Sequence, residues 1–199
     1  MKRILLAFTA VGACVALAGC TGDTPAAPTA PAPAVTVTSS PTALALPVAD
    51  PQLVTWLDGF CGAVNGYLQR SNAYMTTKPA TQTLSMGEAQ LDASKDLRQV
   101  ADNAGKVVDE INALPSVSDP QTETAKKSYL DKFTAARDKA TQAKAKLDAA
   151  KRGNVKAVTE AGDVLTAVQK DVSDFYDPLK PFGADGKYLA AAATAPKCK

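Results

Sequence analysis

Four long stretches carry apolar residues at alternating steps of three and four, and this spacing constrains the fold more than any other feature of the chain. They span residues 53–74, 93–114, 129–150 and 158–179. Such spacing places one apolar stripe along one face of a helix, and no stretch alternates at period two for long enough to predict a strand. We therefore predict an all-α fold, an up-down antiparallel four-helix bundle. A dimeric coiled coil has the same periodicity and is the alternative to a monomeric bundle.

Residues between these stretches are typical of helix ends. Ser85 and Glu88 have the spacing of a capping box, with Leu84 before them as a hydrophobic staple. We predict that Pro115 ends the second helix and that Asp119-Pro120 begins the third. We also predict that Gly153-Asn154 separates the third helix from the fourth, and that Pro178 and Pro181 end the fourth.

The first 20 residues differ from the rest of the chain. Lys2 and Arg3 precede an apolar run over residues 4–17 that is too short to span a bilayer, which predicts a secretory signal peptide over residues 1–19. The run ends in Leu17-Ala18-Gly19-Cys20, which resembles the lipobox of bacterial lipoproteins. That resemblance implies cleavage before Cys20, acyl chains on Cys20, and a mature chain anchored by lipid to the extracytoplasmic face of the cell membrane. An ordinary secretory signal with a chance cysteine is the alternative.

Proline, alanine and threonine dominate residues 20–50, and charge is nearly absent there. A segment of this composition cannot bury a core, so we predict a disordered tether over residues 20–50 and a helical domain over residues 51–199. Glycosylation of hydroxyls such as Thr29, Thr36 and Thr38 is a second interpretation. The whole layout resembles small actinobacterial cell-envelope lipoproteins, a resemblance that implies location and carries no site residues.

The chain has four cysteines, of which two are free to pair. Cys14 leaves with the predicted signal peptide and Cys20 is the predicted lipidation site, so Cys61 and Cys198 form the remaining pair. An oxidising compartment favours a disulfide between them, which would pin the C-terminal tail to the middle of the first helix. A free thiol or an intermolecular bond is the alternative.

Several kinds of catalytic chemistry have no support in the sequence. The chain contains no histidine, which removes the usual general base and the commonest zinc ligand. It also lacks a Ser-x-x-Lys pair, a P-loop and a Rossmann glycine pattern. Asp171, Asp174 and Asp177 share one helix edge, where they would hold a cation weakly or form a solvated face. We therefore expect a protein that is not an enzyme and has neither cofactor nor metal.

The charge is uneven along the chain. Without Lys2 and Arg3, 20 basic residues balance 20 acidic ones, so no basic field for nucleic acid is expected. Ten basic residues nevertheless fall between residues 126 and 156, against three acidic ones. We interpret this strip, with Lys132, Lys139 and Lys146 as candidate binding residues, as facing anionic lipid or an acidic wall polymer. A solvated face neutralised by neighbouring helices is the alternative.

Three glycines interrupt the first helix, and each weakens it by about 1 kcal/mol relative to alanine. Gly59, Gly62 and Gly66 therefore indicate a close approach to its backbone, either by the C-terminal tail or a neighbouring helix, or by a ligand in a groove beside Trp56 and Tyr67.

Aromatic residues concentrate near the C-terminus, over residues 175–182. Tyr176 and Phe182 are candidate contact residues for a partner. Packing over the end of the bundle is the alternative interpretation.

Taken together, these features favour a non-enzymatic, membrane-anchored, surface-exposed lipoprotein whose helical domain binds another envelope component. The second hypothesis is a carrier that holds an apolar ligand such as a lipid between its helices. A solid core with an exposed patch would favour the binding domain, whereas a cavity lined by leucine and valine would favour the carrier.

Overall fold

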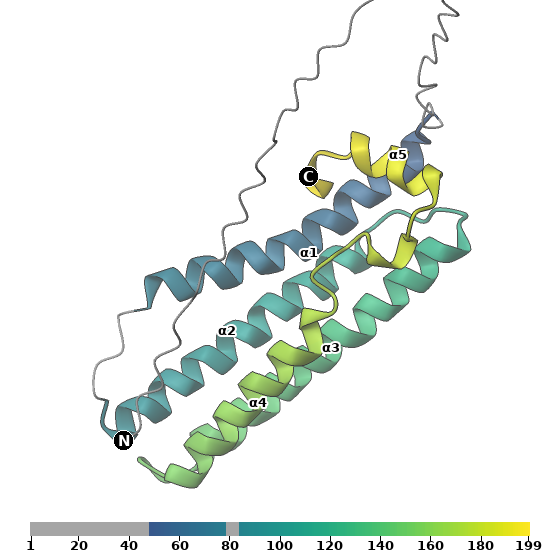
Figure 1. Ribbon diagram of the computed structural model, residues 1–199. Helices are drawn as coiled ribbons and strands as arrows, with labels where there is room; N and C mark the ends of the chain where they lie inside the picture. Colours follow the sequence, from purple (N-terminus) through teal and green to yellow (C-terminus); the bar gives the residue numbers. More distant parts are fainter. Residues whose placement is uncertain (1–47, 79–83) are drawn as a thin grey trace, which may run out of the picture. The chain divides into compact units, whose positions relative to one another are not determined.

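The computed structural model describes residues 48–78 and 84–199, and the described chain is entirely helical. It contains five α-helices, two short 3-10 turns and no strand within these ranges, which confirms the predicted all-α class. The predicted signal peptide, Cys20 and the predicted tether up to residue 47 lie outside the described residues. The elements are α1 (Pro51–Thr77), α2 (Met86–Asn112), α3 (Pro120–Ala149), α4 (Val155–Ser173), η1 (Lys180–Phe182), α5 (Gly186–Thr194) and η2 (Pro196–Cys198) (Figure 1).

The predicted caps are present at the helix starts. Ser85 and Glu88 form a reciprocal capping box at α2. The Asp119 carboxylate accepts the backbone N–H of Gln121 at 2.9 Å at the start of α3. Asn154 caps α4 directly after Gly153, whose φ of 77° suits a residue without a side chain.

The end of α4 was predicted too late. The pattern continued to Leu179, but α4 ends at Ser173 and the chain turns at Asp174. Pro178 disfavours helical geometry at the residue before it, which explains an end some residues upstream. Phe175 and Leu179 extended the apolar pattern because they pack on the core from the segment after the helix.

The four long helices alternate in direction along the chain (Figure 1). Helix α2 packs against α1, α3 and α4, and α3 packs against both α2 and α4. Helix α1 instead finds its other neighbours in α5 and η2. In the described chain α1 and α4 are therefore not packed along their length, which leaves an open side between them.

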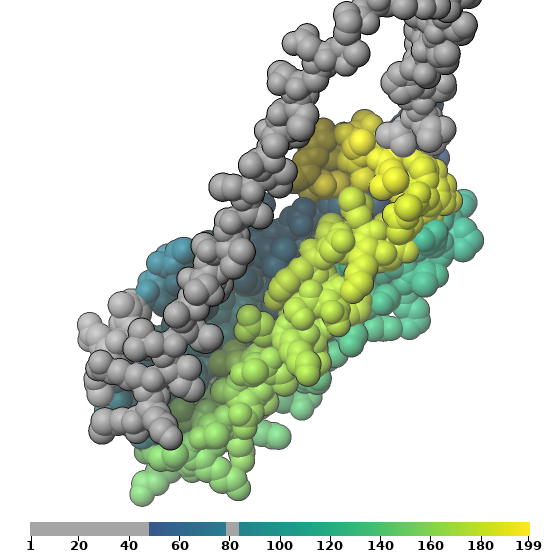
Figure 2. Space-filling model, in the orientation of Figure 1, coloured from purple at the N-terminus to yellow at the C-terminus, as the bar shows by residue number. Residues whose placement is uncertain are grey.

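The C-terminal segment covers part of the open side. On the face seen in Figure 2, α4 and the residues that follow it form one continuous ridge of green and yellow atoms. The hydroxyl of Tyr129 donates to the Asp177 carbonyl at 2.6 Å, and Gln121 Nε2 donates to the Pro181 carbonyl at 2.8 Å. Helix α5 was not predicted, although Asp185 caps it and a run of alanines follows, which is a readable helix signal.

The buried side chains form two clusters of different character. The aromatic cluster lies between α1, the second half of α2, α3, the end of α4 and the C-terminal segment. Its ring pairs include Phe60 with Trp56 and with Tyr129, each at a centroid separation of 4.8 Å. The alanine cluster lies between α2, α3 and α4 near the connections that precede α2 and α4. Its buried members are Leu97, Ala140, Leu147 and Ala161.

Cys61 and Cys198 form a disulfide with their Cα atoms 5.1 Å apart, as predicted. The backbone N–H of Lys197 donates to Asp58 at 2.8 Å, and Asn65 donates to the Lys197 carbonyl at 2.7 Å. The tail is therefore fixed to α1 by one covalent bond and two hydrogen bonds. We call this end of the molecule the disulfide end, and the opposite end, where α1 and α3 finish and α2 and α4 begin, the loop end.

Candidate functional site

An open groove of about 290 Å³ lies between the second half of α1 and the middle of α4, with α2 as its floor. It occupies the side on which α1 and α4 do not pack together. We call it the tyrosine groove, because three tyrosines contribute to its walls. Its lining is mostly apolar or aromatic, with several amides and hydroxyls: Tyr67, Ser71, Tyr74, Met75, Asp96, Gln99, Val100, Asn103, Leu165, Val168, Gln169 and Tyr176.

The floor of the groove is polar because the α1 stripe changes character after Tyr67. Ser71 takes the next inward position, and Asn103 of α2 lies beside it with 2% of its surface exposed. Asn103 Nδ2 donates to Ser71 Oγ at 3.3 Å, while Asn103 Oδ1 accepts from Gln99 Nε2 at 3.0 Å. These hydrogen bonds hold the polar part of the groove floor in one arrangement.

A charged cluster closes the groove toward the loop end. The hydroxyl of Tyr74 donates to Asp96 at 2.8 Å. The ammonium of Lys78 lies 2.7 Å from Asp96 and 3.0 Å from Asp92. This cluster ties the last turn of α1 to α2 and keeps the two helices together where the apolar stripe has ended.

The tyrosine hydroxyls of the groove remain protonated at neutral pH. Burial raises the pKa of Tyr67 to about 12, an effect to which the neighbouring Tyr176 adds. Burial, together with the hydrogen bond to Asp96, likewise raises the pKa of Tyr74 to about 12. These groups therefore act as hydrogen-bond donors and as aromatic surface, properties suited to binding.

Two of the three glycines of α1, Gly59 and Gly62, lie where another segment of the chain comes close to the helix. A side chain at Gly59 would meet a methyl group of Leu114 at 2.5 Å, and one at Gly62 would meet the stem of Lys197 at 2.7 Å. The tail and the turn that follows α2 thus approach the α1 backbone at these two glycines, which also line an open groove of about 880 Å³. Of the residues predicted to flank a ligand groove there, Trp56 is fully buried in the aromatic cluster, while Tyr67 lines the tyrosine groove.

The three candidate lysines of α3 have different surroundings. Lys139 pairs with Asp171 of α4 at 2.7 Å, so the neighbouring helix neutralises it. Lys132 lies 5.6 Å from the centre of the Phe175 ring. Lys146 is exposed near the loop end and lines a shallow groove between α3 and α4.

The two aromatic candidates also separate. Phe182 is buried against Trp56 and Tyr188, so its ring is core and offers no surface to a partner, and packing over the bundle end accounts for it. Tyr176 is half-buried in the wall of the tyrosine groove, 6.2 Å from the Tyr67 ring. The prediction missed the rest of the groove, although Ser71 at an inward position of α1 was a readable signal for it.

The acidic edge of α4 does not come together as a cation site. Asp171 pairs with Lys139, and Asp174 and Asp177 follow the end of the helix. Within the described ranges, no group of three or more potential metal ligands is present.

Comparison of the chain with protein-family models, with curated proteins and with solved structures finds no match. No helix in the described ranges combines the length and the apolar composition that a membrane span requires.

Proposed function

We propose that this chain is a lipid-anchored, extracytoplasmic binding protein, and that the tyrosine groove takes an extended, mainly apolar segment of another envelope protein. The proposal for the anchor rests on the lipobox-like sequence ending in Cys20. The observation that carries the proposal for binding is the open groove, in which tyrosine rings and aliphatic side chains surround amide and hydroxyl groups. Rings supply contact area, and a side-chain amide such as that of Gln169 can bond to a peptide backbone.

The groove favours a binding domain over a lipid carrier. Both buried clusters are filled by side chains, and the groove opens to solvent along one side of the molecule. A carrier requires an apolar cavity that encloses most of its ligand. An apolar ligand held between the helices stays as the second candidate, because Leu165, Val168 and Val100 would suit an acyl chain.

We also propose that the domain is a monomeric up-down antiparallel four-helix bundle that is open between α1 and α4. The alternating directions of the helices support this arrangement. Light scattering of the purified chain tests it: a monomer is expected, whereas a dimer would favour intermolecular packing of the apolar stripes.

The anchor is tested by Cys20→Ser in the native host. The wild-type chain is expected in the membrane fraction and labelled by a palmitate analogue, and the variant is expected to lose the label. A variant that keeps the label would refute lipidation at this residue.

The groove is tested by photo-crosslinking from its rim. A photoreactive residue replacing Gln169 is expected to capture a protein, and one replacing Thr166, which is exposed on the same helix outside the groove, is expected to capture none. Val100→Trp, which fills the floor, should abolish the crosslink. Crosslinks to lipid, together with lipid bound to the purified chain in native mass spectrometry, would instead establish the carrier.

A further inference from the structure

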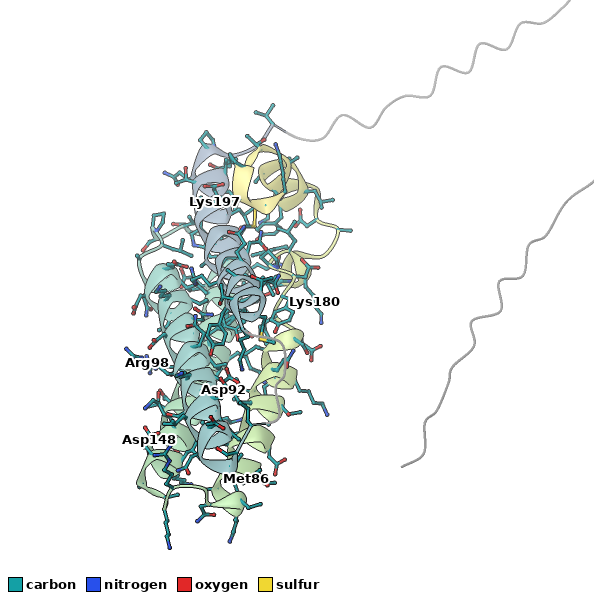
Figure 3. The ribbon with its side chains drawn as sticks, turned by 90° about the vertical axis from the view of Figure 1, so that its left-hand side faces the viewer. Met86, Asp92, Arg98, Asp148, Lys180 and Lys197 are labelled. Carbon is teal, nitrogen blue, oxygen red and sulfur yellow. A yellow bond between two sulfur atoms is a disulfide. The ribbon has the colours of Figure 1, made fainter. Side chains whose placement is uncertain are left out.

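Large apolar side chains are exposed mainly at the loop end. Seven such side chains are exposed in the described residues, and five of them belong to the last turn of α1, the approach and first turns of α2, and the start of α4. Figure 3 shows Met86 at this extremity, with Lys197 toward the opposite end. The five are between 42% and 64% exposed: Met75, Leu84, Met86, Leu91 and Val155.

The loop end also holds more basic residues than acidic ones. Residues 74–78, 84–92 and 144–158, which make up the described loop end, hold six basic residues and three acidic ones. Lys78, Lys144 and Lys156 are each paired with a carboxylate. The other three have no carboxylate oxygen within 4.0 Å in the described chain: Lys146, Lys151 and Arg152.

We propose that the loop end docks on the surface of an anionic lipid bilayer. Leu84, Met86, Leu91 and Val155 enter the interface between headgroups and acyl chains, while Met75 stays in the wall of the tyrosine groove. The unpaired cations face lipid phosphates. An acidic polymer would need the cations but would leave the apolar side chains in water. The combination of both on one end therefore favours a bilayer as the partner.

This contact is separate from the predicted lipid anchor and does not depend on it. The loop end lies one length of α1 away from Asp50, which is about 40 Å for a helix of 27 residues. The 29 residues between Cys20 and Asp50 can span up to about 100 Å when extended. An anchored chain is therefore long enough to let its loop end reach the same membrane.

The first test is co-sedimentation of residues 21–199, which include every described residue, with lipid vesicles. Binding is expected to vesicles of equal parts phosphatidylglycerol and phosphatidylcholine, and to fall away at about 1 M salt, where charges are screened within about 3 Å. Lys151→Gln combined with Arg152→Gln should weaken binding about thirtyfold, since each cation near an anionic surface contributes roughly a factor of five.

A matched control uses two exposed lysines outside the loop end. Lys180 and Lys199 have no ion pair in the described chain, so Lys180→Gln combined with Lys199→Gln removes the same charge. Binding of this variant should change by less than about twofold if location matters as well as charge. Equal losses in the two double variants would overturn the proposal.

The second test asks whether the apolar side chains enter the bilayer. Trp56 is the single tryptophan and is fully buried, so a second tryptophan reports on its own position. The fluorescence of Val155→Trp should be quenched by brominated acyl chains, and that of Leu189→Trp on α5 should not. Two outcomes would refute docking on an anionic bilayer. One is equally strong binding to vesicles of phosphatidylcholine alone. The other is an absence of quenching at position 155 together with equal binding to soluble polyphosphate.

Discussion

The two ends of this domain are built in opposite ways. At the disulfide end, aromatic rings fill the core, and the tail is tied to α1 by a covalent bond. Toward the loop end, the buried cluster consists of two leucines and two alanines, and large apolar side chains are left in water. The aromatic core and the surface proposed for bilayer docking therefore lie apart: the disulfide end holds the helices together, which lets the loop end expose groups that a core would otherwise bury.

The sharpest test of this comparison is to remove one large side chain from each buried cluster. Phe60→Ala should lower the free energy of unfolding by about 4 kcal/mol, because Phe60 contacts three other rings. Leu97→Ala should cost about 3 kcal/mol, since it removes fewer atoms. Urea unfolding measures both, with Leu91→Ala as an exposed control expected within about 0.5 kcal/mol of wild type. A larger loss of unfolding free energy from Leu97→Ala would mean that the alanine cluster contributes more to stability than the aromatic cluster.

Breaking the disulfide should affect the two ends unequally. Cys61→Ser combined with Cys198→Ser is expected to lower the free energy of unfolding by about 3 kcal/mol, because the bond closes a long loop. In native-state hydrogen exchange, the amides of α5 should exchange faster than in the wild type. The amides around Leu97 should still exchange only through global unfolding of the domain. Uniform acceleration throughout the described helices would show that the ends are not independent.

Asp119 provides a pH-dependent connection at the disulfide end. Although burial opposes ionisation, hydrogen bonds from Lys187 and Tyr188 of α5 lower the pKa of Asp119 from 3.8 to about 2. Its ionised form therefore stabilises the fold above about pH 4, and this contribution is lost as the pH falls toward 2.

The variant Asp119→Asn isolates this effect, because asparagine also caps helices well. We expect it to lower the free energy of unfolding at pH 7 by about 2 kcal/mol, with the loss of charge-assisted hydrogen bonds as the cause. The difference from wild type should shrink between pH 4 and pH 2. A difference that stays constant over that range would assign the loss to packing and not to charge.

The smallest expected effect separates two glycines of the same helix. Gly66→Ala places its new methyl group against the flexible end of Arg70, at 2.9 Å, so the gain in helix propensity should stabilise the domain by up to about 1 kcal/mol. Gly59→Ala meets a methyl group of Leu114 at 2.5 Å, and this clash should cancel or exceed that gain. Thermal unfolding checks the sign, and equal effects would mean that the approach of Leu114 does not require Gly59.

Local signals in the sequence accounted for much of the fold. The apolar period predicted the four long helices, and Ser85, Asp119 and Asn154 marked their starts because a capping side chain bonds to the backbone beside it. The pairing of Cys61 with Cys198 followed from counting cysteines. The period also led to an error at Leu179, because it records that a residue is buried without recording which element buries it.

The candidate surfaces depended on contacts between distant residues. The helical character of the described chain, the starts of most helices and the cysteine pairing could be read from the amino-acid order, since each follows from neighbouring residues or from composition. The separation of α1 and α4 around Tyr67 and Tyr176, the burial of Phe182 and the neutralisation of Lys139 became apparent once the helices were assembled. A side chain's exposure and charge partners depend on helix faces brought together from distant parts of the chain, and periodicity along one helix does not specify its neighbours.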